Sequence, residues 1–144
     1  MHLLIRLVQD NSGYPPFSAE EVDATEVADH TFRLEGVPAF AFGLARGDVV
    51  RTAHDGSQQW IEELIEPSGH SAVRVIGLAG RSVDDVKATL ELLGCLTFPT
   101  VIDGMIAVDV PPHVDFDEVR GLLLQGRELS HWDFSEGVRG DGRD

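Results

Sequence analysis

The chain has 144 residues, of which 42% are hydrophobic and 25% charged, a composition typical of one globular domain or of two small units that share a core. Eleven basic against 25 acidic residues give a formal net charge of −14, which disfavours nucleic acid and anionic lipid surfaces as partners. No apolar run approaches the roughly 20 residues of a membrane-spanning helix, and the N-terminus lacks the features of a signal peptide, so we expect a cytoplasmic protein.

Short strands separated by turn-forming residues fill the first half of the chain. Residues 1–8 are rich in Leu, Ile and Val and predict a first strand, and residues 22–34 predict a hairpin that turns at Ala28-Asp29. A second turn, at Asp55-Gly56, precedes a strand at residues 60–65. Closely spaced strands broken by Gly, Pro and Asp indicate a small antiparallel β unit over residues 1–71, either a bent sheet or a partial barrel.

Strands and helices alternate after residue 71. Residues 72–78 form an apolar run interrupted only by Arg74, as in a central strand covered on both faces. Ser82 and the acidic residues after it predict the start of a helix, which Gly94 ends.

A β-hairpin and a second helix complete this half. Two strands, at 96–102 and 105–110, are joined by Asp103-Gly104, and Pro99 places the first of them at a sheet edge. A helix that begins at Asp115 and ends at Gly126 leads to a strand at 129–134. The order β-α-β-β-α-β predicts a ferredoxin-like unit over 72–136, so the whole chain is expected to be α+β, with the β unit packed on this half. The Gly-rich residues 137–144 predict a disordered tail.

Four short sequences, taken together, resemble a known family. They are Tyr14-Pro15-Pro16-Phe17; Val37-Pro38 followed by the segment 43–50; Glu66-Pro67-Ser68-Gly69-His70-Ser71; and Ile106-Ala107-Val108-Asp109-Val110-Pro111-Pro112. In order and spacing the chain resembles the bacterial domain-of-unknown-function family 4265. The resemblance implies no activity and assigns no catalytic or binding residue.

The segment from Glu66 to His70 gathers groups suited to acid and base chemistry. His70 can exchange a proton near neutral pH, and Glu66 could orient it, with Ser68 as a nucleophile. The alternative is structural, because Pro67-Ser68-Gly69 is also a typical tight turn, in which Ser68 caps the backbone and His70 packs at the junction of the halves. Cys95, the single cysteine, is either a second candidate nucleophile or a small buried hydrophobic residue.

Other chemistry has less support. The six histidines lack paired spacing and one cysteine excludes a thiolate cage, so no metal site and no cofactor are predicted. The acidic surface either serves solubility or attracts a partner protein with a basic surface. Candidate binding residues are Trp60, Ser71, Tyr14 and Phe17.

Two functional hypotheses follow, and the sequence leaves open whether the protein is an enzyme. The first is an acidic binding or regulatory protein that recognises a protein partner or a small ligand in the groove between its halves. The second is a small hydrolase- or transferase-like enzyme with His70 as general acid or base at the junction. A monomer or a weak dimer fits either hypothesis. The strand that contains Pro99 is an exposed edge at which a second copy could pair, but the missing N–H of the proline discourages such pairing.

Overall fold

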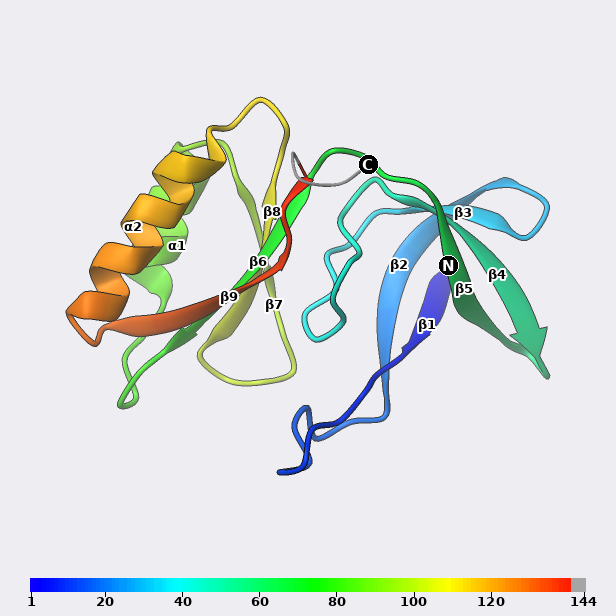
Figure 1. The fold of residues 1–144 in the computed structure, drawn as a ribbon, viewed down its shortest axis with the longest axis horizontal. Coiled ribbons are helices and arrows are strands. Elements are labelled where there is room, and N and C mark those ends of the chain that lie inside the picture. The colour runs from blue at the N-terminus through cyan, green and yellow to red at the C-terminus, as the bar shows by residue number, and fades with distance from the viewer. Residues whose placement is uncertain (141–144) are drawn as a thin grey trace.

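The computed structural model describes residues 1–140, which form two halves lying side by side (Figure 1). A β-barrel makes up one half, and a four-stranded sheet carrying two helices makes up the other. Within these residues nine strands and two helices are present, so the protein is α+β as expected. In this part of the chain neither helix is long and apolar enough to cross a lipid bilayer.

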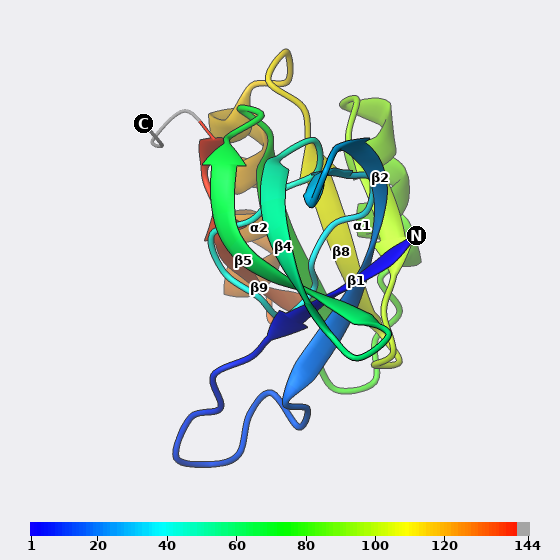
Figure 2. The same cartoon turned by 90° about the vertical axis from the view of Figure 1, so that its right-hand side faces the viewer.

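Five strands form the barrel, with each strand antiparallel to the next along the chain. They are β1 (His2–Arg6), β2 (Ala19–Ala28), β3 (Thr31–Leu34), β4 (Val49–Asp55) and β5 (Gln58–Glu66). Alternate residues such as Leu3, Phe32 and Val50 fill the interior. Leu4 of β1 pairs with Trp60 of β5 in parallel, and this contact closes the sheet (Figure 2). The barrel is therefore more complete than the bent sheet or partial barrel that the sequence predicts.

The second half is an antiparallel sheet in the order β7-β8-β6-β9, with both helices on one face. Its elements are β6 (Ser71–Gly77), α1 (Asp84–Leu92), β7 (Leu96–Pro99), β8 (Met105–Val110), α2 (Phe116–Glu128) and β9 (Trp132–Val138). Side chains from the helices and from one face of the sheet share a core that includes Val75, Leu90, Val108 and Leu123. Pro99 lies in β7 at the sheet edge, which confirms the expectation based on its missing N–H.

The C-terminal helix and strand differ from the prediction in position. Gly126 does not end α2, which continues to Glu128, and this glycine is not among those with a positive φ that a helix stop would need. The ring of Trp132 instead packs on the helix at Gly126. A Cβ on Gly126 would lie 2.0 Å from two ring atoms of Trp132. β9 consequently begins later than expected and extends through Gly137 and Val138, which the sequence assigns to a tail; residues 141–144 of that tail lie outside the described part.

A loop from the barrel half joins the two halves. Between β3 and β4 the chain crosses to the sheet, where Ala39 packs with Met105 and Ala107 on the face opposite the helices. The Gly43 N–H donates to the Gly137 carbonyl at 3.0 Å, where β9 shifts its register against β6. Glu20 of β2 fixes the loop from the barrel side, because its carboxylate accepts the N–H groups of Ala39, Phe40 and Ala41. The interface therefore combines a small apolar core with a fixed backbone segment.

Candidate functional site

His70 and Asp109 form a close pair where the chain passes from the barrel to the sheet. His70 follows the turn after β5, and its Nδ1 lies 2.7 Å from Oδ1 of Asp109 in β8. The imidazole is 20% exposed, whereas the carboxylate is completely buried. With the proton on Nδ1, the imidazole donates to Asp109 and keeps a lone pair on Nε2. The partner of His70 is thus Asp109, a residue that the sequence does not single out.

The environment of Asp109 combines burial with nearby positive charge. Its Oδ2 is buried without a hydrogen-bond partner among the described residues and lies 4.0 Å from Nη1 of Arg46. Burial raises the pKa of this carboxyl group above its ordinary value, and the hydrogen bond from His70 opposes that rise. Arg46 is held in turn by its Nε, which donates to the carbonyl of Glu35 at 2.9 Å.

Ser68 has a structural role in the turn before His70. Its hydroxyl donates to the carbonyl of Arg46 at 2.7 Å and accepts the N–H of His70 at 3.1 Å. The Ser68 N–H donates to the buried carboxylate of Asp48 at 2.8 Å, and the same carboxylate accepts the N–H of Ala45. The turn packs closely on Gly47, where a Cβ would lie 3.0 Å from that of Ser68 and where φ is +85°. Because its proton is already donated to a carbonyl, Ser68 is poorly placed to act as a nucleophile.

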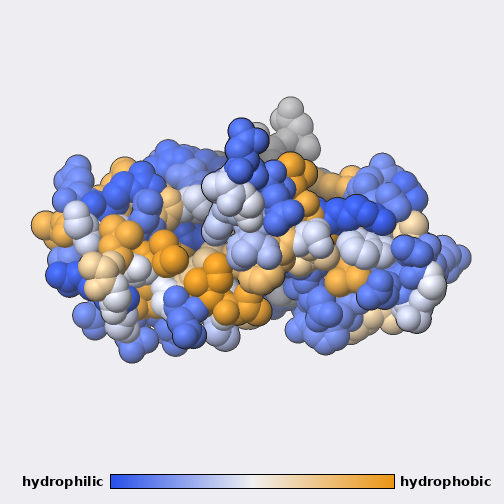
Figure 3. All heavy atoms as spheres, turned by 90° about the horizontal axis from the view of Figure 1, so that it is seen from below, coloured by the Kyte–Doolittle hydropathy of each residue, from blue (hydrophilic) through white to orange (hydrophobic). Residues whose placement is uncertain are grey.

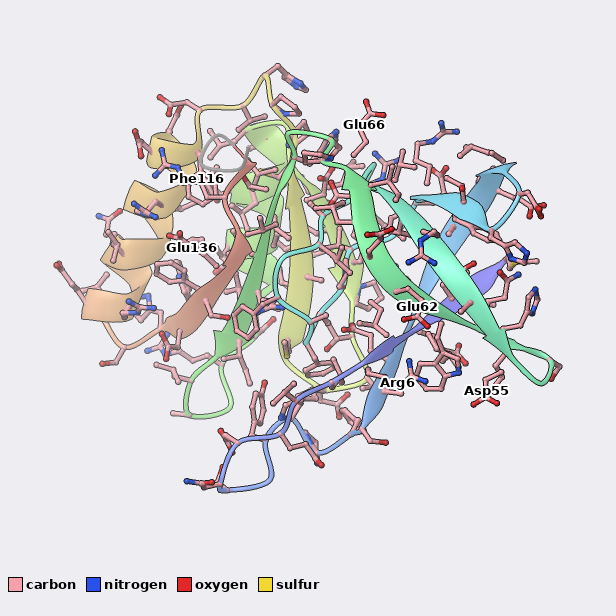
Figure 4. The ribbon with its side chains drawn as sticks, turned by 45° about the vertical axis from the view of Figure 1, so that its right-hand side comes forward. Arg6, Asp55, Glu62, Glu66, Phe116 and Glu136 are labelled. Carbon is pink, nitrogen blue, oxygen red and sulfur yellow. The ribbon has the colours of Figure 1, made fainter. Side chains whose placement is uncertain are left out.

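The structure separates Glu66 from this pair. Glu66 ends β5, and its side chain is exposed and points away from the body of the protein (Figure 4). The orienting carboxylate of His70 is therefore supplied by Asp109, 39 residues further along the chain.

Cys95 is buried in the core of the second half. Burial and the negative charge of Asp109 raise the pKa of its thiol to about 11, so that the thiol is protonated at neutral pH. This environment suits a packed hydrophobic residue and not a thiolate nucleophile.

An open cavity of about 480 Å³ lies between the halves, away from the His70–Asp109 pair, and we call it the groove. The barrel half contributes the end of β1, the loop after it and residues 39–42; the other half contributes Arg74, Met105 and Ser135. Figure 3 shows the face seen from below, where hydrophobic side chains reach the surface near the middle of the molecule. Most of the lining is apolar, so the groove has the character of a ligand pocket.

Arg74 brings positive charge to the groove. It lies in β6 opposite Ala107 and is 5% exposed. The Phe42 ring covers its guanidinium group at 4.4 Å from the ring centroid, and Gly137 leaves room for it on the backbone side. Nη2 donates to the carbonyl of Ala41, whereas Nε is buried without a hydrogen-bond partner within residues 1–140.

The four candidate binding residues lie in different places. Tyr14 lines the groove, and Phe17 lines a neighbouring cavity of about 420 Å³; both pack edge-on against Phe40. Trp60 is not part of the groove and lies under the guanidinium of Arg6 at 4.2 Å. Ser71 is buried, and its hydroxyl accepts the N–H of Gly140.

Sequence reasoning missed the site roles of Asp109 and Arg74, although each has a visible signal. Each is one charged residue in an otherwise apolar strand, Asp109 between Val108 and Val110 and Arg74 between Val73 and Val75. A charge on a strand that is covered on both faces requires a partner or a ligand, which makes such positions candidates.

No group of three or more His, Cys, Asp and Glu side chains within the described chain is arranged to hold a metal ion. The His70–Asp109 pair brings together one nitrogen and one carboxylate, fewer ligands than a metal ion needs for a stable site.

Comparison with known proteins gives a fold relative and a family. A crystal structure described as that of a hypothetical protein from Neisseria gonorrhoeae superposes with a TM-score of 0.81 at 20% sequence identity, covering 97% of this chain and 96% of that one. No curated protein matches the sequence. The model of the family described as domain of unknown function DUF4265 matches residues 20–134, and the chain therefore belongs to that family.

Proposed function

We propose that the protein binds a small ligand in the groove between its halves. The observation that carries this proposal is the cavity of about 480 Å³ with a largely apolar lining drawn from both halves. Ligand pockets commonly have volumes of about 300–1,000 Å³ and combine apolar walls with a few polar groups. Arg74, Tyr14 and Ser135 are such polar groups here.

The form of the groove favours a small ligand over a protein partner. A docked protein needs an extended complementary surface of roughly 800 Å² on each side. The groove is instead a concave site whose lining includes the exposed residues Phe42 and Ser135 and the buried residues Arg74 and Met105. A ligand there would touch both halves at once.

We also infer that the second half is ferredoxin-like. The strand order β7-β8-β6-β9, with both helices on one face, supports this description. The barrel loop packs on the sheet face opposite the helices. The groove would lie on that same face, which the helices leave uncovered.

A fragment library screened by protein NMR tests the binding function. We expect at least one compound to shift the backbone amide signals of Phe42 and Ser135, which line the groove. Ser135→Trp places a large side chain at the exposed rim and should abolish these shifts. Leu92→Trp, at an exposed position on α1, is the matched control and should leave them unchanged. Hits that map elsewhere on the protein, or that survive Ser135→Trp, would contradict the proposal.

A second candidate function is acid–base catalysis at His70. The 2.7 Å contact between His70 and a buried carboxylate supports it, because such a pair fixes the tautomer of the imidazole and aims its other nitrogen. The engaged hydroxyl of Ser68 and the buried thiol of Cys95 leave water or a substrate hydroxyl as the nucleophile that His70 would activate.

Hydrolysis of p-nitrophenyl acetate is a direct test of this candidate. If His70 is a general base, His70→Gln should lower the rate above buffer by about 100-fold or more. His113→Gln, a change to an exposed histidine whose charge also acts on Asp109, should retain the activity. Equal rates for the wild type and His70→Gln would exclude general-base catalysis by His70 in this reaction.

A further inference from the structure

Arg74 is a buried cation whose charge is not matched by a carboxylate in contact. Its guanidinium group makes no ion pair with any residue in the range 1–140, although 95% of its surface is buried. Glu20 is the carboxylate whose charge acts on Arg74, and it does so without forming an ion pair. Burial lowers the pKa of Arg74, because a site removed from water disfavours the charged form. A buried charge of this kind is normally paired, so its position at the base of a cavity points to an anionic ligand.

Glu20 is not available as that partner. Its two carboxylate oxygens accept three backbone N–H groups, from Ala39 at 2.5 Å and from Phe40 and Ala41 at 3.0 Å. These contacts hold the carboxylate against the loop. The loop in turn presents the Ala41 carbonyl to Arg74, so the guanidinium is positioned by neutral groups and by the Phe42 ring.

The charge balance of the groove favours a single negative charge on the ligand. Beside Arg74 and Arg6, the groove contains Asp10, an acid that lies at the loop end of the cavity and holds the Ser12 and Tyr14 N–H groups. A dianionic phosphate would need more donors than one buried guanidinium provides, and the protein carries a net charge of −14. A carboxylate matches the planar guanidinium in both charge and geometry.

The remaining lining requires an apolar body. Five apolar side chains line the same cavity as Arg74, those of Leu7, Val8, Phe40, Phe42 and Met105. We propose that the groove binds monocarboxylates with an aliphatic or aromatic body, the carboxylate at Arg74 and the body against these side chains. This inference rests on the proposed binding function and specifies its ligand class.

Matched pairs of probes separate the ligand class from the binding function. Octanoate with octanamide, and 3-phenylpropanoate with 3-phenylpropanamide, have nearly the same shape and differ in charge. We expect both carboxylates to shift the amide signals of Phe42 and Ser135 on titration and to bind at least about tenfold more tightly than the amides. Phenyl phosphate, a dianion with a similar ring, should bind more weakly than 3-phenylpropanoate.

Two further measurements assign this preference to Arg74. Arg74→Met keeps an apolar stem and should bring the dissociation constants of each carboxylate and its matching amide within about twofold of each other. Arg74→Lys should keep part of the preference for the carboxylate. If Arg74→Met does not fold, the Nε–H signal of Arg74 in the wild type should move with octanoate and not with octanamide.

Three results would overturn the ligand class. They are equal affinity of carboxylate and amide in the wild type, no binding of either carboxylate, or a charge preference that survives Arg74→Met. If library compounds still bind in the groove in any of these cases, the binding function stands and only its ligand class is wrong. If the Ser135→Trp screen also fails, both proposals are wrong.

Discussion

Asp109 is a carboxylate that the fold buries completely beside one imidazole. Because burial raises its pKa above the ordinary value of 3.8, the stability contributed by this group is fully present below that value and is lost as the pH rises through the raised pKa. The ionised form is the one that the buried site disfavours.

Asp109→Asn removes this pH dependence. We expect the free energy of unfolding of the variant, relative to the wild type, to increase by about 1 kcal/mol or more from about pH 4 to about pH 8. Urea unfolding at a series of pH values measures the difference. Asp109→Val is an uncharged replacement of another shape. Its free energy of unfolding relative to the wild type should increase with pH in the same way, although its value at any one pH will differ from that of Asp109→Asn. Parallel stability curves for the wild type and both variants would contradict the raised pKa.

Cys95 should be unreactive in the folded protein. Its thiol is buried and its pKa is about 11, so the thiolate needed for disulfide exchange is scarce at neutral pH. We expect a colorimetric disulfide reagent to label Cys95 at least about 100-fold more slowly in native buffer than in denaturant. Leu92→Cys, at an exposed position on α1, provides a second thiol that should react at once. Rapid labelling of native Cys95 would show that the core opens readily or that the thiol is activated.

The element α2 contains two glycines with opposite roles. Gly121 has no atom within 4 Å of where a Cβ would be, whereas a Cβ on Gly126 would overlap the Trp132 ring. That ring is held by its Nε1, which donates to the Leu123 carbonyl at 3.1 Å. Gly126 is therefore a packing residue at the contact between α2 and β9, and Gly121 is an exposed helix position.

These glycines make a matched pair of substitutions. Gly126→Ala should lower the free energy of unfolding by about 2–3 kcal/mol, because Trp132 has to move. Gly121→Ala should raise it by about 0.5–1 kcal/mol through helix propensity. Thermal unfolding measures both changes, and tryptophan fluorescence should change only in Gly126→Ala. Similar effects of the two substitutions would mean that Trp132 does not pack as described.

Local patterns predict the elements better than they predict the site. Asp115 caps α2 through the Asp117 N–H as expected, and Gly94 follows α1 with a φ of 105°. These features depend on neighbours along the chain. The misplaced helix end at Gly126 and the missed partner of His70 depend instead on Trp132 and Asp109, which approach only in the folded chain. The junction position of His70 follows from the sequence, but the orienting carboxylate could not be chosen from sequence proximity, which points to the exposed Glu66.

In the whole molecule, the loop between β3 and β4 determines how the halves meet. Glu20 holds this loop by three hydrogen bonds from the barrel side, and Arg74 and Gly137 hold it from the sheet side. The apolar contact of Ala39 with Met105 and Ala107 lies within the same interface. One carboxylate therefore fixes three consecutive residues of the loop that joins the halves.

Glu20→Gln tests this arrangement. An amide can accept fewer hydrogen bonds than a carboxylate and brings N–H groups that would face other donors, so we expect a loss of about 1–3 kcal/mol in the free energy of unfolding. Hydrogen exchange at Ala39, Phe40 and Ala41 should accelerate at the same time. Glu21→Gln, at the adjacent position with a side chain that is 67% exposed, is the control and should change stability by less than about 0.5 kcal/mol. Unchanged exchange in Glu20→Gln would show that the contacts with the sheet fix the loop without the carboxylate.

The sheet residues that hold this loop are synthesised after the barrel, and this affects the order in which the two halves fold. A ribosome that has synthesised the chain to Glu66 has supplied every strand of the barrel, and domains fold from the N-terminus during synthesis. The Gly137 carbonyl, which accepts the Gly43 N–H, belongs to β9, the last strand to be synthesised. We therefore expect the barrel to fold first, with its loop still unattached, and the groove to form as one of the last steps of biosynthesis.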